Sequence, residues 1–578
     1  MIILSLCILL RCLRSMLSGR YEQEVWAYLR VGEDFLPVHH WENIIGRGAS
    51  ADLRVFGSGI ARTHAILSRD DKGRWKIQDV FSRGGVWVNS ERVAGYGERL
   101  HDGDLINLGG SCLKFRLMKR ADKAEMERER TAAGRRVNPA VTLIELSLMQ
   151  LLLLLQHCFS AEKEYVGGIA LAFISLIGIE WLLFALMKLM RKNGFEIETL
   201  AFFLTGLGMS VAASSTPEDM LKQLILTAAS VALFLAGGLW LRSLKRSSAF
   251  RIPIAVFSMG LLALNVLAGS STYGASNWLS FGGYSFQPSE IVKVCYVYAG
   301  SAAMDTLYKR NNLFAFIGFS ALCVVALALI GDFGTALIFF VSFLVISFMR
   351  SGSIATVLLA VSGAGLAGFL AVSVKPYIKQ RFASWGHVWE DVYDTGYQQT
   401  RAMSAAASGG VVGKGAGNGW LKDVFAANTD MVFAMECEEL GLAVAVCMVL
   451  AVVLMAFFAV RETKRCRSAY NGIAACAAMS MLLCQLGLNV FGSLDILPFT
   501  GVTFPFVSRG GTSLISCWML MAFLKSADNR RGSSFAVAEG NREADCFEEP
   551  PEDYSEEDYS AWEVHPVINL LDEEEREE

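Results

Sequence analysis

Long apolar stretches alternate with short polar turns between residues 140 and 526. A helix that crosses a bilayer needs about 20 predominantly apolar residues, and stretches close to that length recur twelve times in this region. The pattern predicts a polytopic α-helical membrane domain with ten to twelve transmembrane helices. The predicted spans are 141–158, 166–190, 198–215, 219–241, 250–269, 289–309, 312–330, 333–350, 353–374, 431–458, 468–492 and 506–526.

Residues 24–118 follow a different pattern, in which apolar and polar residues alternate in short runs separated by Gly, Asn and Asp. Alternation with a period of two is typical of strands that bury one face, and turn residues at this spacing favour two packed sheets. We therefore predict an N-terminal all-β sandwich over residues 24–118. Its clearest strands are Asp52–Val55, Trp75–Val80, Val86–Val88 and Cys112–Leu117.

Three further segments flank these two domains. Residues 1–23 begin with an apolar run that is too short to span a bilayer and has no positive charge before it, so we expect an interfacial segment or an over-long start. Residues 119–139 form a charged linker, and residues 527–578 form an acidic tail. Such blocks of charge are usually solvated and disordered, so no function is assigned to the tail.

Composition supports this division and excludes several classes of protein. Hydrophobic residues make up 53% of the chain and charged residues 19%, against about 25% charged in soluble domains. A wholly soluble enzyme, a disordered chain and a nucleic-acid-binding protein are therefore excluded. The 13 cysteines include no C-x-x-C pair and the 7 histidines do not cluster, so neither a zinc site nor a disulfide framework is expected.

Basic residues gather at one end of the predicted spans. By the positive-inside rule that end is cytoplasmic, and the β-sandwich and the acidic tail lie on the same side. The long loop 375–430 and the loops 270–288 and 493–505 then face outward. The basic flanks are Lys188–Lys192, Arg242–Arg246, Lys309–Arg310, Arg350 and Arg461–Arg467.

Two positions at the membrane edge carry ionisable residues, which are costly to bury and often functional. Glu290 and Lys293 are three residues apart and share one helix face. That spacing fits a local ion pair at a helix start, and it also fits a functional role. Asp332 lies between two apolar stretches, where a helix N-cap and a direct role both fit.

The outward loops carry further acids and irregular backbone. Asp391 and Asp394 lie among aromatic residues and follow Arg381, and Glu439 lies where the chain enters the next predicted span. Prolines and paired glycines between residues 498 and 513 imply non-helical backbone, which is tolerated at membrane depth only where it is buried or lines a cavity. These features predict an acid- and cation-lined cavity that opens outward, and a transporter would satisfy that description as well as an enzyme.

In their order along the chain, the outward segments resemble the SEDS family of bacterial cell-wall synthesis, the RodA, FtsW and SpoVE proteins. The resemblance covers roughly residues 200–526, and the ordered set of motifs is highly specific although each motif alone is weak. The matching segments are Trp278 with Gln287–Lys293, Asp332–Ala336, Gly396–Gln398, Thr429–Ala434, Glu438–Gly441 and Pro505–Gly511.

The resemblance implies an inverting glycosyltransferase that polymerises lipid II into glycan strands on the outer face of the cytoplasmic membrane. The family's essential aspartate carries over best to Asp391, which would act as general base. Asp394 competes for this role because Val392 replaces the proline usual after that aspartate. Lys293 and Arg381 would offset pyrophosphate charge. The other residues that the resemblance places at the substrate are Trp278, Glu290, Asp332, Gln398, Asp430, Glu439 and Ser508.

The N-terminal sandwich resembles an FHA domain, a module that binds phosphothreonine. The residues that fit the pattern, and so the candidates for phosphopeptide contact, are Arg47, Arg62, His64 and Asn89. Ala61 stands where the family has a serine and Gly84 where it has the loop asparagine, but Arg47 alone can still pair with a phosphate. Phosphothreonine binding and a degenerate docking surface both remain open.

Two other functions fit the same residues. A lipid II flippase or transporter would use the charged cavity, and a phospho-dependent cell-wall scaffold would act through the FHA-like domain. The resemblance further implies a class B penicillin-binding protein as transpeptidase partner and a phosphothreonine protein as partner of the FHA-like domain. The sequence requires no cofactor, although a divalent cation, Mg²⁺ or Mn²⁺, could bridge the pyrophosphate.

Overall fold

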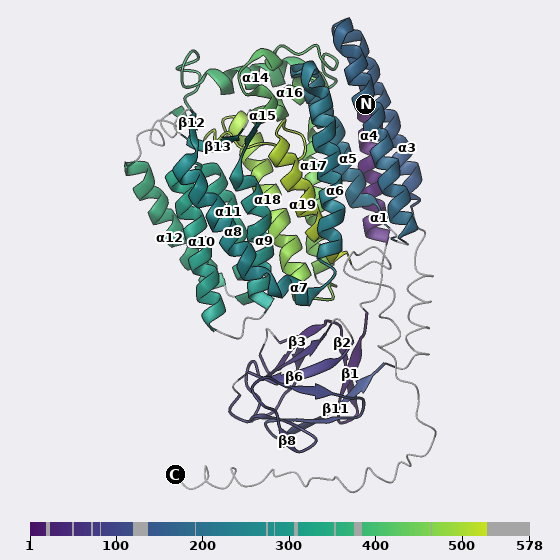
Figure 1. Ribbon diagram of the computed structural model, residues 1–578, viewed down its shortest axis with the longest axis vertical. Coiled ribbons are helices and arrows are strands. Elements are labelled where there is room, and N and C mark those ends of the chain that lie inside the picture. Colours follow the sequence, from purple (N-terminus) through teal and green to yellow (C-terminus); the bar gives the residue numbers. More distant parts are fainter. Residues whose placement is uncertain are drawn as a thin grey trace.

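A computed structural model describes most of the chain. The described residues are 1–18, 24–48, 51–70, 73–80, 82–118, 137–190, 192, 194–272, 275–281, 284–305, 310–351, 354–374, 384–463 and 465–528. They form a long helical bundle with a β-domain at one end (Figure 1). Most of the predicted linker, Arg381 and the tail beyond Asp528 lie outside the described residues.

The β-domain is the predicted all-β sandwich. Its strands are β1 (Ala27–Val31), β2 (Asp34–Val38), β3 (Glu42–Gly46), β4 (Leu53–Arg54), β5 (Ala65–Arg69), β6 (Trp75–Asp79), β7 (Val86–Val88), β8 (Glu91–Arg92), β9 (Glu98–Leu100), β10 (Leu105–Leu108) and β11 (Ser111–Leu117). They form two sheets, ordered β2-β1-β11-β10-β7-β8 and β4-β3-β5-β6-β9. Alternate residues of β5, such as Ala65 and Leu67, are fully buried, as expected for strands that bury one face.

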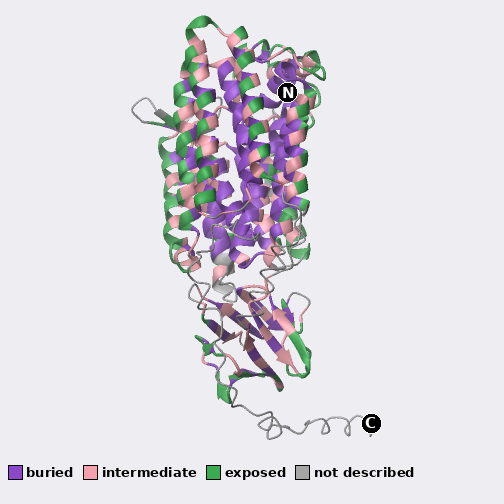
Figure 2. Ribbon diagram, turned by 90° about the vertical axis from the view of Figure 1, so that its right-hand side faces the viewer, coloured by how far each residue is buried: buried purple, intermediate pink, exposed green. Residues whose placement is uncertain are grey.

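The bundle contains twelve long helices within the described residues. They are α3 (Pro139–Ser160), α4 (Lys163–Leu189), α5 (Glu196–Ser215), α6 (Met220–Trp240), α8 (Arg251–Ala268), α9 (Pro288–Asp305), α10 (Arg310–Ile330), α11 (Phe333–Ser351), α12 (Ile354–Val374), α17 (Leu442–Thr463), α18 (Ala469–Ser493) and α19 (Gly511–Ala527). Eight helical stretches of the described chain are long and apolar enough to cross a membrane. Figure 2 shows buried residues along the middle of the bundle and exposed residues along its outside. The length and apolar composition of the eight stretches agree with the predicted polytopic helical membrane domain.

Smaller elements cover the end of the bundle that lies opposite the β-domain (Figure 1). We call this the loop end. Its elements are the three-stranded sheet of β12 (Ser270–Thr272), β13 (Ala275–Phe281) and β14 (Tyr284–Phe286), and the short helices α14 (Tyr397–Gly409), α15 (Ala427–Asp430) and α16 (Val432–Glu439). The short helix α7 (Leu244–Ala249) lies at the other end, next to the β-domain (Figure 1).

Two predicted spans are wrong at their starts. The single span expected over 431–458 is divided, because α16 ends at Glu439 and Gly441 turns the chain with φ of +89° before α17 begins. Such a positive φ favours glycine. The span expected from residue 506 begins only at Gly511, because the preceding residues form turns in which Phe506 has φ of +65°.

The N-terminal apolar segment also differs from the expected interfacial segment. Residues Ile2–Ser18 form helix α1, and the side chains of Ile8, Cys12 and Met16 are buried in the core of the bundle. Arg11 forms an ion pair with Glu145 of α3 at 2.8 Å. Tertiary partners therefore bury one face of a helix that is too short to span a bilayer by itself.

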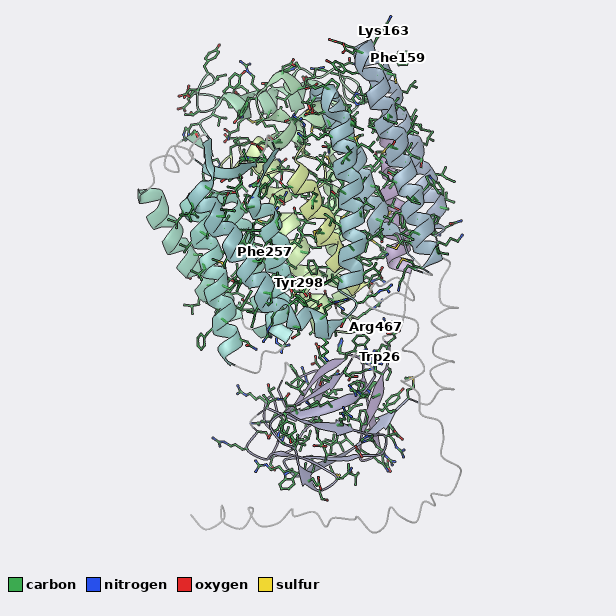
Figure 3. All side chains as sticks on the ribbon, in the orientation of Figure 1. Trp26, Phe159, Lys163, Phe257, Tyr298 and Arg467 are labelled. Carbon is green, nitrogen blue, oxygen red and sulfur yellow. The ribbon has the colours of Figure 1, made fainter. Side chains whose placement is uncertain are left out.

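The β-domain contacts the α17–α18 connection through tryptophan and arginine side chains. Arg467 donates to both carboxylate oxygens of Glu24, at 2.5 and 2.8 Å, and its guanidinium lies 5.4 Å from the ring centroid of Trp26. Arg69 lies over the rings of both Trp26 and Trp41, at 4.9 and 5.1 Å. Trp26 and Arg467 meet where the β-domain approaches the bundle (Figure 3). Cation–π contacts of this kind stabilise an interface by about 0.5–2 kcal/mol each.

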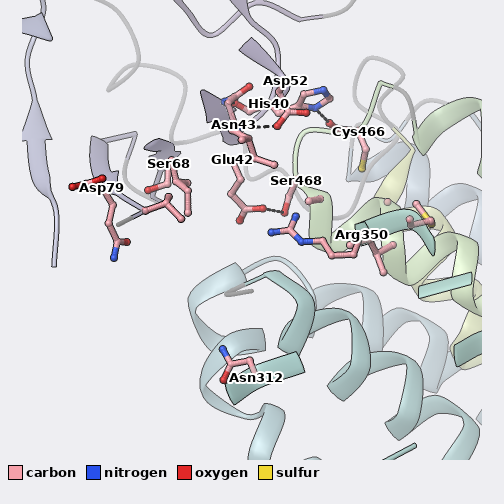
Figure 4. A pocket seen from close by; sticks show the side chains of 18 of the residues that line it. His40, Glu42, Asn43, Asp52, Ser68, Asp79, Asn312, Arg350, Cys466 and Ser468 are labelled. Atoms are coloured by element: carbon pink, nitrogen blue, oxygen red, sulfur yellow. Dashed lines mark hydrogen bonds between the residues drawn. The ribbon is translucent and has the colours of Figure 1, made fainter. Parts of the chain in front are cut away.

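Polar contacts and a cavity complete this interface (Figure 4). The His40 Nδ1 atom lies 2.6 Å from the carbonyl oxygen of Cys466, and the Ser468 hydroxyl donates to Glu42 at 3.3 Å. A cavity of about 1150 Å³ lies beside these contacts and is lined by residues of both domains. The β-domain is thus docked on the bundle through the residues before β1 and the start of β3.

Replacing Arg467 with alanine should loosen the β-domain from the bundle, because the substitution removes the bidentate partner of Glu24 and the cation over Trp26. We expect amide exchange in residues 39–42 to rise about tenfold, the effect of one charge-assisted hydrogen-bonded pair. Hydrogen-exchange mass spectrometry of the purified protein measures this rise. Lys245→Ala removes an exposed cation at the same end of the bundle and is the matched control; equal exchange in the two variants would contradict the expectation.

Candidate functional site

The loop end brings together segments that are far apart in the sequence. The indole nitrogen of Trp385 donates to the Ile496 carbonyl at 3.2 Å, and the amide of Gly386 donates to Asp495 at 3.2 Å. Gln399 also donates to Asp495, at 3.4 Å. The long loop is therefore fixed to the α18–α19 connection. Asp495 has this role although the sequence analysis did not single it out; its only sequence signal was an acid in an outward loop.

Asp391 lies in an exposed turn of this loop. Its carboxylate accepts hydrogen bonds from the hydroxyl and the amide of Thr395, at 3.0 and 3.3 Å, and its carbonyl accepts from the amide of Gly396 at 3.0 Å. Gly396 has no room for a side chain, because a Cβ there would overlap the Val388 carbonyl. The turn therefore holds the Asp391 carboxylate in place at the surface. Asp394 is exposed too, but the described residues place no hydrogen bond on its carboxylate.

Three other predicted site residues brace the loop end through backbone contacts. Gln398 donates to the Phe425 carbonyl at 3.0 Å. Ser508 donates to the Thr429 carbonyl at 2.5 Å, and the carbonyl of Asp430 accepts from a side-chain amide of α18 at 3.0 Å. The structure thus brings Gln398, Asp430 and Ser508 to the same end of the bundle as Asp391.

Glu290 and Lys293 form the local ion pair that their spacing allowed. Their charged atoms are 2.7 Å apart and their side chains are only 5% and 1% exposed. Ser516 of α19 donates to Glu290 at 2.5 Å, and Lys293 donates to Gln485 of α18 at 2.9 Å. Gln485 in turn donates to Thr503 at 2.9 Å. This buried network joins α9, α18 and α19 beneath the loop end.

Asp332 is the N-cap of α11. One carboxylate oxygen accepts from the Thr335 amide at 3.0 Å, and the other accepts from Gln287 at 3.3 Å. Burial raises the pKa of Asp332, and the hydrogen bonds from Thr335 oppose that shift. The N-cap expectation is therefore confirmed, and Gln287 connects this cap to the start of α9.

Two buried glutamates organise the glycine-rich part of the long loop. Glu438 accepts from the Lys414 ammonium at 2.7 Å and from the Leu421 amide at 3.0 Å. Glu439 accepts from Ser214 of α5 at 2.6 Å and from the Gly417 amide at 2.8 Å. Burial raises the pKa of Glu439 to about 7, against the opposing effect of these two hydrogen bonds. The sequence analysis quoted Glu438 only as part of a motif, and its contacts with Lys414 and Leu421 show that it holds the loop.

Two predicted substrate residues of the membrane domain remain, Trp278 and Arg381. Trp278 lies on β13 at the loop end and is 39% exposed, whereas Arg381 lies outside the described residues. Within the described ranges, no group of three or more His, Cys, Asp or Glu side chains could hold a metal ion.

The four phosphopeptide candidates of the β-domain fall into two groups. Arg47 and Arg62 are exposed on neighbouring loops, which backbone hydrogen bonds join: the Arg47 amide donates to Ala61 at 3.1 Å and the Gly48 amide to Arg62 at 2.9 Å.

His64 and Asn89 are internal contacts of the fold. The His64 ring lies fully buried and contacts the Ala61 amide at 3.1 Å and the Gly85 carbonyl at 3.0 Å. Asn89, with φ of +47°, donates to Asp104 at 2.8 Å and accepts from Leu105 at 3.0 Å. Of these four candidates, Arg47 and Arg62 are the two that carry an exposed charge.

Known relatives match about half of the chain. A probable peptidoglycan glycosyltransferase FtsW of Buchnera aphidicola is 30% identical over 289 residues, which cover 48% of this chain and 71% of that protein. FtsW of Escherichia coli is 31% identical over 299 residues, covering 49% and 72%. The peptidoglycan glycosyltransferase RodA of Mycobacterium tuberculosis is 26% identical over 322 residues, covering 52% and 69%.

Solved structures with similar folds cover the same two parts. A peptidoglycan synthase complex contains a chain with 23% identity and a TM-score of 0.48, covering 58% of this chain and 98% of that one. RodA of Thermus thermophilus has 22% identity and a TM-score of 0.43, covering 58% and 97%. An FHA domain of Mycobacterium tuberculosis has 27% identity and a TM-score of 0.15, covering 16% and 97%.

Two family models match the chain. The model of the FHA domain matches residues 43–109, within the β-domain. The model described as cell cycle protein, which represents FtsW, RodA and SpoVE, matches residues 197–532 and so more than half of the chain. The chain therefore belongs to the FtsW/RodA/SpoVE family and carries an N-terminal FHA domain.

Proposed function

We propose that this chain is an inverting peptidoglycan glycosyltransferase that polymerises lipid II, with Asp391 as its general base. Its membership of the family and the names of its relatives support the activity. The observation that carries the assignment of the base is the exposed Asp391 carboxylate, which Thr395 orients at the loop end by two hydrogen bonds. An exposed but oriented carboxylate can accept a proton from a sugar hydroxyl without first breaking a buried ion pair.

The proposed reaction is a single displacement. Asp391 takes the proton of the acceptor hydroxyl, the oxygen attacks the anomeric carbon of the donor, and the lipid pyrophosphate leaves from the opposite face. This path inverts the anomeric centre, and base catalysis of this kind contributes about 10²–10⁴-fold. Lys293 is enclosed by Glu290 and Gln485, so we assign it to the buried network that joins α9, α18 and α19 beneath the site. Arg381 is then the candidate cation for the pyrophosphate.

We also propose the orientation and the partners of the protein. The basic flanks of the spans support a cytoplasmic FHA domain, and the loop end at the opposite side of the bundle would then face outward (Figure 1). A class B penicillin-binding protein would cross-link the strands, and a phosphothreonine protein would bind the FHA domain. The reaction would need no bound cofactor, and a divalent cation would act only by bridging the pyrophosphate of the substrate.

Replacing Asp391 with asparagine should abolish polymerisation, because the amide cannot accept the hydroxyl proton. We expect the rate of glycan formation from labelled lipid II to fall about 10²–10⁴-fold with unchanged thermal stability. Asp394→Asn is the matched control and should retain activity, and addition of a chelator tests the need for a divalent cation. If Asp394→Asn is the inactive variant, the base is misassigned. Translocation of labelled lipid in vesicles without glycan formation would instead identify a flippase.

Replacing Thr395 with valine should slow polymerisation without abolishing it. The valine keeps the shape of threonine but lacks the hydroxyl that donates to Asp391. Because a hydrogen bond to a charged group contributes about 1.5–3 kcal/mol and this one is exposed, we expect a loss of about tenfold. Initial rates on lipid II measure the loss. Thr395→Ser keeps the hydroxyl and should keep the rate, so equal losses in both variants would disprove an orienting role.

Replacing Arg47 with alanine should weaken the binding of phosphothreonine peptides to the FHA domain, because an exposed guanidinium is the natural partner of a phosphate in this loop. We expect the dissociation constant to rise at least about tenfold, measured by fluorescence anisotropy with the full chain in detergent. Arg30→Ala, on β1 and outside these loops, is the control. Equal affinity in wild type and Arg47→Ala would favour a degenerate docking surface.

A further inference from the structure

Helices α3 and α4 form an antiparallel hairpin, residues 139–189, that precedes the family match at residues 197–532. Its tip reaches the loop end, where Phe159 and Lys163 lie at the outer edge of the bundle (Figure 3). In the apolar stretch of each helix, only 33% of the residues are buried. Most of the hairpin surface therefore faces away from the rest of the bundle. The inward side of its tip contacts the long loop of the proposed site.

Two residues at the tip make these contacts. The side-chain oxygen of Gln156 accepts a hydrogen bond from the amide of Ala416 at 3.0 Å. Ser160 packs so closely against Gly417 that a Cβ at that glycine would overlap its hydroxyl, and Gly417 has φ of +79°. The chain therefore approaches the hairpin at a position that only glycine can occupy without strain.

The hairpin tip is itself fixed to the rest of the bundle. The His157 Nε2 atom lies 2.9 Å from the Ser210 hydroxyl of α5, in a fully enclosed position. The ring of Phe173 on α4 supports the imidazole, with ring centroids 6.1 Å apart. His157, on α3, thus packs against α4 and forms a hydrogen bond with α5, the first helix of the family match. It connects the hairpin to the rest of the bundle.

The loop segment beneath the tip is the one that the buried glutamates organise. Gly417 donates its amide to Glu439 at 2.8 Å, and its carbonyl accepts from the Lys422 ammonium at 2.7 Å. Ala416 is fully buried. Gln156 therefore satisfies an amide in a segment that has no regular secondary structure of its own, and a buried amide without a partner would be costly.

We propose that the α3–α4 hairpin is a positioning element for the outward loop and that Gln156 is its positioning residue. The proposal rests on the proposed glycosyltransferase activity for its functional part. By fixing residues 413–419 against Glu438 and Glu439, the hairpin holds the described part of the loop, residues 384–430, in the geometry that polymerisation requires. Gln156 acts through the loop and does not touch the substrate.

The test compares three variants of the full-length protein in lipid nanodiscs. Gln156→Met keeps the length and volume of the side chain but removes the acceptor oxygen, whereas Gln156→Glu keeps an acceptor at the same reach. Phe159→Ala removes an 84% exposed side chain from the same tip and is the control. Hydrogen-exchange mass spectrometry of residues 410–422 and the initial rate of glycan formation are measured for each protein.

We expect Gln156→Met to speed exchange in residues 410–422 by about two- to tenfold, the effect of one net hydrogen bond, and to slow polymerisation by a similar factor. Gln156→Glu should restore both quantities, and Phe159→Ala should change neither. Unchanged exchange in Gln156→Met would overturn the proposal, and so would faster exchange with an unchanged polymerisation rate. If wild type itself forms no glycan, the proposed activity fails, whereas the exchange measurement still decides whether the hairpin holds the loop.

Discussion

The membrane domain depends on one constraint: polar groups inside it must find their partners within the protein, because lipid offers none. Glu290 and Lys293 pair with each other at 2.7 Å, Ser516 donates to the same Glu290 oxygen, and Lys293 also donates to Gln485. Removing one member would leave a buried charge without compensation, which typically costs about 3–5 kcal/mol. The network therefore fixes α9, α18 and α19 relative to one another and gives the loop end a rigid base.

The same constraint shapes the long loop. Residues 413–419 form no helix or strand, so their amides need partners from elsewhere in the protein. The backbone carbonyls of Glu438 and Glu439 accept from the Lys414 and Gly415 amides, and the Glu439 carboxylate accepts from the Gly417 amide. The turn around Asp391, by contrast, is exposed, and Thr395 donates a hydrogen bond to its carboxylate. A reactive group on a small turn that is carried by a rigid platform is pre-organised for its substrate, and such pre-organisation lowers the barrier to reaction.

The sequence predicted the features that depend on local pattern and missed those that depend on packing. The spans followed from apolar length, and the cap at Asp332 followed from a short acidic side chain before an apolar run. The break at Gly441 lies in the backbone, where a φ of +89° separates the two helices, and a hydropathy pattern does not report a backbone angle. The orienting contact of Thr395 is four residues away from Asp391, whereas the contact of Gln156 with Ala416 spans 260 residues. Such pairs arise from how the helices pack, and no single-sequence pattern encodes them.

The FHA domain can contact the helical bundle and bind a phosphorylated protein at the same time, because the two contacts lie at different ends of one strand. Strand β3 begins at Glu42, which contacts Ser468 of the bundle, and ends at Gly46, next to the exposed Arg47. At about 3.3 Å per residue, the docking contact and the phosphate candidate lie at opposite ends of one short strand. A phosphorylated protein bound at Arg47 would therefore leave the contacts of Arg467 with Glu24 and Trp26 intact. It would be held at one end of the bundle while glycan formed at the other, with α17 running the whole distance from Gly441 to the docking connection.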